Sequence, residues 1–187
     1  MEAFLVSTGI VALAEMGDKT QLLALVLAAR YRRSVPIVLG ILVATLANHA
    51  LAAGFGTWIT GMAGPEAMRW ILGVSFIAMA VWTLVPDRLD EGAPARNRLG
   101  IFGATLVAFF LAEMGDKTQV ATIALAARYD AIVSVVAGTT LGMMLANVPV
   151  VYFGERILRR VPVRILHGVA AVVFAIMGVL ALLAPPA

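Results

Sequence analysis

The chain has 187 residues, of which 61% are hydrophobic and 13% charged, and its mean hydropathy is +0.96. Ordinary globular domains have about 45–50% apolar and about 25% charged residues, so this composition excludes a soluble globular protein. The sequence contains no cysteine, which excludes a disulfide scaffold, a thiolate zinc site and an iron–sulfur cluster. The formal charge of +3 comes from short basic clusters between apolar segments, a pattern typical of membrane orientation rather than nucleic-acid binding.

Apolar runs of about twenty residues, the length that crosses a bilayer, alternate with clusters of Arg, Pro and Gly. We therefore expect an all-α integral membrane protein in which residues 1–187 form one transmembrane domain. Gly138 and Gly142 form a G-x-x-x-G pair that predicts a close helix contact, and His167 is expected at the membrane interface. The six predicted membrane-spanning helices cover residues 3–29, 34–62, 67–86, 99–127, 131–154 and 163–184.

Arginines gather on one side of the predicted bundle. The other side has only Arg69 and Arg128, a ratio of ten to two. Because cytoplasmic loops carry the excess of Lys and Arg, we expect the richer side in the cytoplasm and both termini outside it. The arginines of the richer side are Arg30, Arg32, Arg33, Arg88, Arg96, Arg98, Arg156, Arg159, Arg160 and Arg164.

A repeat at a spacing of 98 residues organises the chain. The sequence LAEMGDKTQ occupies residues 13–21 and again 111–119, and LAARY follows each copy. Each repeat contains three predicted helices, so the second repeat enters the membrane from the opposite side to the first, as in many secondary transporters. We expect six transmembrane helices arranged as two inverted three-helix repeats, over about 1–88 and 99–187, with a cytoplasmic linker over about 87–98.

Each repeat carries the charged sequence EMGDKTQ inside an apolar span. The apolar arms before and after the first copy have 12 and 8 residues, whereas a span needs about 20 residues. The motif therefore either lies within one span or joins the two arms of a re-entrant hairpin. An unpaired Asp or Lys near a helix centre costs about 2.5–3.5 kcal/mol, so these groups are expected to avoid lipid. The i,i+4 spacing predicts pairing of Glu15 with Lys19 and of Glu113 with Lys117.

The charges of the two motifs predict a site for a divalent cation. Each copy has two carboxylates and one ammonium, so two facing copies leave two negative charges. Such oxygen-rich sites suit Ca²⁺, Mg²⁺ or Mn²⁺, and the motifs contain no His or Cys that would favour copper or zinc. The predicted metal ligands are Glu15, Asp18, Thr20, Gln21, Glu113, Asp116, Thr118 and Gln119, with Lys19 and Lys117 as ion-pairing and proton-coupling groups.

Other polar and small residues in the predicted spans have less specific roles. Gly17 and Gly115 lie inside the motifs and allow either close helix approach or a local break that frees backbone carbonyls. Asn48 and Asn147 lie in the second span of each repeat and are candidates for a secondary amide ligand or for a hydrogen bond between helices. His49 is a candidate proton relay, although the second repeat has no matching histidine.

The duplicated E-x-G-D-K-T motif, on the first span of each half, resembles that of the Gdt-type family of divalent-cation/proton exchangers. This family includes Golgi exchangers of manganese and calcium and bacterial manganese exporters. The resemblance extends over essentially the whole chain and implies that Glu15, Asp18, Glu113 and Asp116 are cation-binding acids. The chain begins directly with its first apolar segment, which is similar to bacterial members and favours a bacterial plasma membrane.

Together these features predict a secondary transporter, not an enzyme, that exports Mn²⁺, or else Ca²⁺, from the cytoplasm in exchange for protons. We expect no permanently bound cofactor and no nucleic-acid partner; the expected partners are the metal ion and the lipid bilayer, and a homo-oligomer stays open. The main alternative is an exporter of cationic or zwitterionic amino acids, whose ammonium group the same acids would hold. A passive cation channel and a non-transporting assembly factor are further alternatives.

Overall fold

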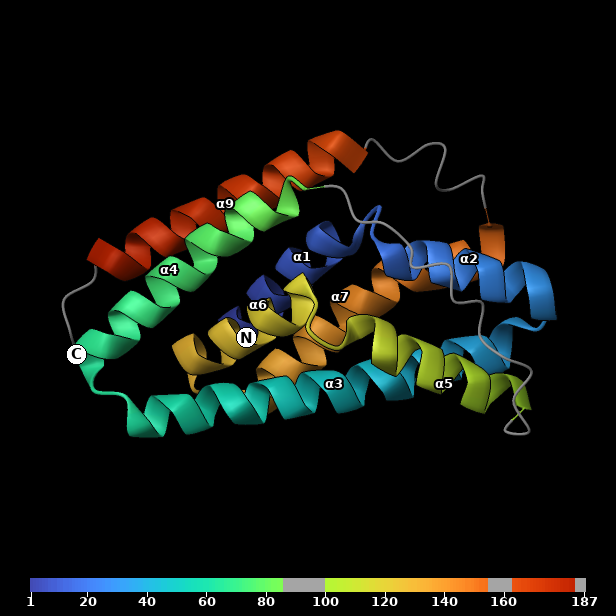
Figure 1. The fold of residues 1–187 in the computed structure, drawn as a ribbon, viewed down its shortest axis with the longest axis horizontal. Coiled ribbons are helices and arrows are strands. Elements are labelled where there is room, and N and C mark those ends of the chain that lie inside the picture. The colour runs from blue at the N-terminus through green and yellow to red at the C-terminus, as the bar shows by residue number, and fades with distance from the viewer. Residues whose placement is uncertain (86–99, 155–162, 184–187) are drawn as a thin grey trace.

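The computed structural model describes residues 1–85, 100–154 and 163–183, and the regular structure of these ranges is entirely helical (Figure 1). The predicted linker over 87–98 and six of the ten arginines assigned to the richer side lie outside these ranges. The helices are α1 (Glu2–Glu15), α2 (Lys19–Tyr31), α3 (Ser34–Met62), α4 (Pro65–Thr83), α5 (Gly100–Glu113), α6 (Lys117–Tyr129), α7 (Ile132–Phe153) and α9 (Val163–Leu183).

Two of the six predicted spans are not continuous helices. The span predicted over 3–29 consists of α1 and α2, and the span predicted over 99–127 consists of α5 and α6, with a motif at each break. The backbone turns at Gly17 and Gly115, whose φ angles are 89° and 76°. Only glycine adopts this region without strain, so the local break proposed for these glycines is confirmed.

Helices α1 and α2 do not fold back on one another as the arms of a hairpin. Both pack along α7, with α1 on one part of this longer helix and α2 on another, and Figure 1 shows the two following each other along it. At 1.5 Å per residue, neither short helix crosses a membrane by itself. Together they form one interrupted helix, whose break leaves backbone groups free to hydrogen-bond or bind an ion.

The first helix of each half packs on the long helix of the other half. Helix α1 packs on α7, and α5, its counterpart 98 residues later, packs on α3. A Cβ atom added to Gly138 would lie 2.5 Å from the Phe4 carbonyl oxygen, and one added to Gly40 would lie 2.9 Å from the Phe102 carbonyl oxygen. Both the glycines and the phenylalanines are 98 residues apart, so the repeat is present in the packing as well as in the sequence.

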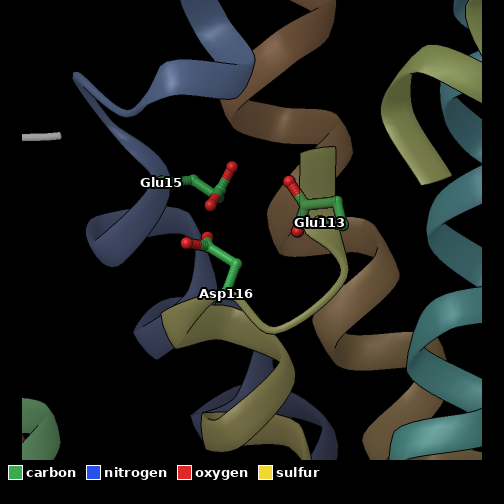
Figure 2. Close-up of side chains that lie close together, drawn as sticks. All are labelled: Glu15, Glu113 and Asp116. Atoms are coloured by element: carbon green, nitrogen blue, oxygen red, sulfur yellow. The ribbon is translucent and has the colours of Figure 1, made fainter. Parts of the chain in front are cut away.

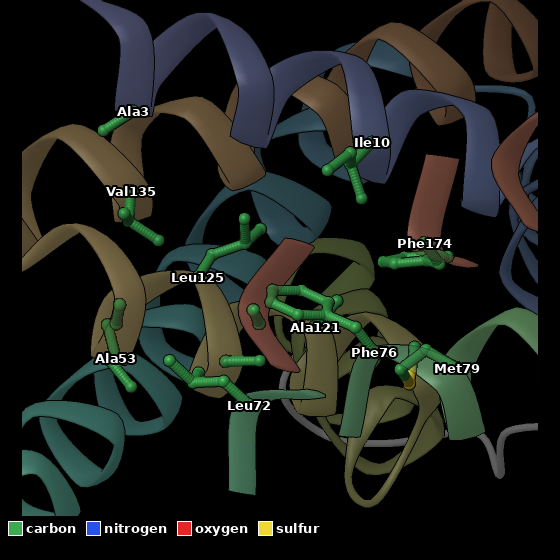
Figure 3. Packing of buried hydrophobic residues seen from close by; sticks show 14 of the residues in the cluster. Ala3, Ile10, Ala53, Leu72, Phe76, Met79, Ala121, Leu125, Val135 and Phe174 are labelled. Atoms are coloured by element: carbon green, nitrogen blue, oxygen red, sulfur yellow. The ribbon is translucent and has the colours of Figure 1, made fainter. Parts of the chain in front are cut away.

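Buried apolar side chains form two separate clusters. The first core joins α1, α4, α6 and α9 with parts of α3 and α7; ten of its side chains, including Leu72, Phe76 and Phe174, are labelled in Figure 3. The second core joins α2 and α5 with other parts of α3 and α7. The breaks lie between the cores, because α1 and α6 belong to the first and α2 and α5 to the second.

The surface of the bundle is suited to lipid. Large apolar side chains are exposed along most of the helices, among them Leu51, Val74, Val81 and Ile176. Three segments, Ser34–Met62, Ile132–Phe153 and Arg164–Leu183, are long and apolar enough to cross a membrane, and Gly100–Glu113 is a shorter apolar helix. The protein is therefore a helical membrane protein.

The close contact of α7 with α1 gives a test of the packing. A Cβ at Gly138 would lie 2.5 Å from a backbone oxygen, whereas one at Gly54, also within a helix, meets nothing within 4 Å. We expect Gly138→Ala to lower the free energy of unfolding by about 1–3 kcal/mol, because overpacking separates the helices, and Gly54→Ala to leave it unchanged or raise it. The measurement is the thermal midpoint in detergent, and equal midpoints would contradict the packing described.

Candidate metal centre

Three acidic side chains converge where the helices break. Glu15 lies at the end of α1, Glu113 at the end of α5, and Asp116 directly before α6, as Figure 2 shows. One carboxylate oxygen from each lies within 4.8 Å of the others, and their exposed fractions are 0%, 0% and 2%. Residues about 100 positions apart in the chain are thus brought together by the exchanged packing of the two halves.

The lysines of the motifs pair across the repeats. Lys19 Nζ lies 3.0 Å from Asp116 Oδ1, and Lys117 Nζ lies 3.0 Å from Asp18 Oδ1. The predicted i,i+4 pairing of each lysine with the glutamate of its own motif was wrong. The prediction assumed a continuous helix, whereas the break separates each glutamate from the lysine that follows it and places each lysine opposite the other motif.

Each glutamate is held by the threonine of its own motif. Thr20 Oγ1 donates a hydrogen bond of 2.5 Å to Glu15 Oε2, and Thr118 Oγ1 donates one of 2.9 Å to Glu113 Oε2. Within the described ranges, the other oxygen of each glutamate, Oε1, is buried without a hydrogen-bond partner, as is Asp116 Oδ2. Because a buried polar atom without a partner is costly, these oxygens are suited to an ion.

The pairing shows where the excess charge lies. Two lysines balance Asp18 and Asp116, so the two net negative charges belong to Glu15 and Glu113. A cluster of buried carboxylate oxygens with this charge matches a hard divalent cation such as Mn²⁺, Mg²⁺ or Ca²⁺. Asp116 is shared, because its Oδ1 pairs with Lys19 and one of its carboxylate oxygens lies within 4.8 Å of a carboxylate oxygen of each glutamate.

The two glutamines predicted as ligands brace the breaks. Gln21 Oε1 accepts a hydrogen bond of 2.7 Å from the Gly17 backbone N–H, and Gln119 Oε1 accepts one of 2.7 Å from Gly115. Gln21 Nε2 also donates to the Ala146 carbonyl oxygen of α7 at 2.8 Å. With their carbonyl oxygens used in this way, the glutamines fix the shape of the chain around the acids.

The asparagines differ in their contacts. Asn48 Nδ2 donates to the Phe110 carbonyl oxygen of α5 at 3.0 Å, so it does bond between helices. Asn147 Nδ2 contacts the Met143 carbonyl oxygen, at 3.2 Å, within its own helix. Both Oδ1 atoms are buried without a partner in the described part of the chain, as are both ring nitrogens of His49.

One contact at the site was missed by the sequence analysis. His167 of α9 is only 9% exposed, and its Nε2 atom lies 2.7 Å from the carbonyl oxygen of Met16, directly after α1. It therefore lies against the first break and not simply at an interface. No motif marks this histidine, because its partner is a backbone atom freed by a helix break 151 residues earlier in the chain.

Comparison with known proteins identifies the family of this chain. The family model described as "Divalent cation/proton antiporter GDT1" matches residues 3–91 and 101–186. The chain belongs to the GDT1 family. Its members are membrane transporters, not enzymes, and the family description names a divalent cation and the proton as the exchanged ions.

Individual relatives support the same assignment. A protein of Vibrio cholerae named "Putative manganese exporter" is 50% identical over 179 residues, covering 95% of this chain and 89% of the relative. GDT1-like protein sll0615 of Synechocystis is 28% identical over 95% of this chain and 97% of the relative. GDT1-like protein 3 of Oryza sativa subsp. indica is 25% identical over 99% and 75%, respectively. No solved structure matches this chain.

The exposure of the two ion pairs gives a second prediction. Both side chains of the Lys117–Asp18 pair are 0% exposed, whereas Lys19 is 25% exposed. We expect Lys117→Met to lower the free energy of unfolding by about 3–5 kcal/mol, because it leaves a buried charge unpaired, and Lys19→Met to lower it less. Adding Asp18→Asn to Lys117→Met should restore much of the loss.

Thermal unfolding of the native chain, the two lysine variants and the double variant in one detergent measures these differences. Glu66→Gln is the control, because Glu66 is 76% exposed, lies 3.7 Å from Arg69, and belongs to a class of surface pairs that contribute little. Equal losses for the two lysine variants would contradict the pairing described.

Proposed function

We propose that this protein exports Mn²⁺ from the cytoplasm in exchange for protons, with the metal bound by Glu15, Glu113 and Asp116. The observation that carries the proposal is the pair of buried glutamates that remain in excess once each lysine is paired with an aspartate, at the junction of the two halves. Thr20 and Thr118 orient the glutamates, and Lys19 and Lys117 balance the aspartates, so that one divalent cation completes the charge of the site.

The preference for Mn²⁺ over Ca²⁺ rests on two considerations. A manganese exporter is what the name of the 50% identical relative describes, and that relative matches nearly the whole chain. A compact group of three carboxylates also suits the smaller ion, because Ca²⁺ takes six to eight oxygen ligands in larger and more flexible sites.

Proton coupling follows from competition for the same atoms. A carboxylate oxygen that binds a metal cannot hold a proton at the same time, so proton binding at Glu15 and Glu113 releases the metal. The family description, a divalent cation/proton antiporter, supports this coupling. A pair of inverted three-helix halves that expose the central acids first to one side and then to the other would carry out the exchange.

The direction of transport depends on orientation. In Figure 1 the connection between α2 and α3, which carries Arg32 and Arg33, lies at the opposite end of the bundle from the connection between α3 and α4. By the excess of arginine, the α2–α3 end faces the cytoplasm and both termini lie outside it. The outer side of a bacterial plasma membrane is the more acidic one. Protons that enter through the exchanger would then drive the metal outward.

An exporter of amino acids is the alternative that needs to be excluded. It would use the same acids to hold an ammonium group, but it also needs a pocket for the rest of the substrate. The acids are fully buried between packed helices, and their separation, within 4.8 Å, suits a single ion. Family membership favours the cation as well.

Metal flux in proteoliposomes tests the proposal. With Mn²⁺ on one side and an imposed pH gradient, we expect uptake to follow the gradient in the native chain and to fall at least tenfold in Glu15→Gln and in Glu113→Gln, about 1.4 kcal/mol or more of lost interaction with the ion. Glu2→Gln, at the exposed start of α1, is the matched control and should keep its flux.

Two results would reject the proposal. Flux that is indifferent to the pH gradient would remove proton coupling, and flux that survives both glutamine variants would remove these acids from the site. If no metal moves and an added cationic amino acid occupies the acids instead, the result would support the alternative exporter.

The choice of metal is tested separately by competition. Because we assign the site to the smaller ion, unlabelled Mn²⁺ should inhibit uptake of labelled Mn²⁺ at a concentration at least tenfold lower than Ca²⁺ does. Equal inhibition by Ca²⁺ would show that the three carboxylates do not discriminate and that the manganese assignment is wrong.

A further inference from the structure

Helices α4 and α9 pack closely on each other and rest on only one end of the bundle. Helix α4 packs on α6 and α9 packs on α1, whereas neither α4 with α5 nor α9 with α2 is a closely packed pair among the described helices. Both α4 and α9 contribute to the first core and neither contributes to the second. In Figure 1 the pair runs beside α1 and α6 and away from α2 and α5.

The repeat continues through this pair. Phe76 and Phe174 are 98 residues apart, as are Met79 and Met177, and the two phenylalanine rings stack on each other with centroids 6.3 Å apart. Helices α4 and α9 are therefore counterparts that meet at equivalent residues. The pair packs on α1 and α6, a surface that we call the first or occupied seat. Because α5 and α2 are the counterparts of α1 and α6, they form an equivalent surface, the second seat, which the pair does not occupy in this structure.

His167 fixes the pair at the occupied seat. Its Nε2 atom lies 2.7 Å from the Met16 carbonyl oxygen, and since a carbonyl oxygen only accepts hydrogen bonds, Nε2 carries the proton and donates it. Met16 directly precedes Gly17, where the chain leaves the helical path. The contact thus ties α9 to the peptide that follows Glu15 of the metal centre.

The counterparts of this contact belong to α4 and to the peptide after α5, and α4 and α5 are not a closely packed pair among the described helices. The residue 98 positions before His167 is Arg69 of α4, and the residue 98 positions after Met16 is Met114. Met114 is 55% exposed. The Arg69 side chain is 25% exposed, lies 3.7 Å from Glu66, and has a buried Nε without a hydrogen-bond partner within the described ranges.

We propose that His167 and Arg69 are positioning residues that hold the α4–α9 pair on two alternate seats. His167 donates to the Met16 carbonyl on the seat beside α1 and α6, and Arg69 donates to the Met114 carbonyl on the seat beside α2 and α5. Each seat covers one side of both breaks, formed by α1 and α6 or by α2 and α5, and leaves the other side uncovered. In this structure Lys19, at the start of α2, is partly exposed and Met114, directly after α5, is exposed, whereas Lys117, at the start of α6, is buried. The α2 and α5 sides of the two breaks are therefore the uncovered ones. This inference rests on the proposed transport function and identifies the part that moves.

The chain contains no cysteine, so introduced pairs report the two seats without background. Ser75 of α4 and Val120 of α6 line the same cavity, and Ser75→Cys with Val120→Cys marks the occupied seat. Their counterparts, 98 residues away, are Val173 of α9 and Leu22 of α2, of which Leu22 is 37% exposed. Val173→Cys with Leu22→Cys marks the second seat.

The experiment compares the yields of the two cross-links, formed by a short bifunctional thiol reagent in proteoliposomes. We expect both pairs to form in the otherwise native chain. His167→Leu should raise the yield of the second-seat link relative to the first about fivefold, the effect of one lost hydrogen bond, and Arg69→Leu should lower it. His167→Gln and Arg69→Lys, which keep a donor, should restore the native ratio.

A general effect on stability would not shift the ratio in opposite directions. Val172→Leu, at an exposed position of α9, is the control and should leave the ratio unchanged. Absence of the second-seat link, an unchanged ratio in both leucine variants, or shifts in the same direction would overturn the proposal.

Metal flux in the same proteoliposomes separates this inference from the proposed function. If the native chain moves no metal, the transport proposal fails, while the cross-link ratio still decides whether the pair changes seats. If metal moves and the ratio does not respond to His167→Leu and Arg69→Leu, the transport proposal stands and the assignment of these two residues fails.

Discussion

The exchanged ion pairs between the two motifs are the constraint on which the rest of the structure depends. Lys19 reaches Asp116 and Lys117 reaches Asp18, so each half supplies the countercharge for the other. Neither half could keep these groups in a bilayer alone, because an unpaired charge there is costly. The pairs therefore hold the two broken helices face to face, and the glycine contacts of α3 with α5 and of α7 with α1 bring the backbones close enough for the lysines to cross.

Because each lysine pairs with an aspartate, the two glutamates are the remaining acids of the motifs. Their neighbouring threonines each hold one oxygen, and the other oxygen is buried without a hydrogen-bond partner among the described residues. The glutamines keep the backbone bent at Gly17 and Gly115. The polar groups of each motif thus have separate tasks: the aspartate and lysine balance charge, the glutamine fixes the break, and the threonine holds one oxygen of the glutamate.

The halves are related in sequence and central packing but not in their surroundings. Lys117 is fully buried and Lys19 is not, and the α4–α9 pair packs on α1 and α6 but not closely on α2 or α5 among the described helices. A carrier with two equivalent halves needs such an inequality, since a symmetric arrangement would expose the central acids equally to both sides. In this structure the inequality is carried by α4 and α9, which meet at the stacked Phe76 and Phe174.

The sequence by itself determined a great deal. Hydropathy predicted a helical membrane protein, the 98-residue repeat predicted two related halves, and the charge count predicted a divalent cation, because composition and spacing are properties of the linear chain. Tertiary structure alone decided which lysine meets which acid, that Gln21 and Gln119 brace the breaks, and that His167 lies on Met16. The predicted pairing within each motif was wrong because local spacing assumes an unbroken helix, and a positive φ at two glycines redirects every side chain that follows. Contacts between residues about 100 or more positions apart depend on how the halves pack, which no local pattern records.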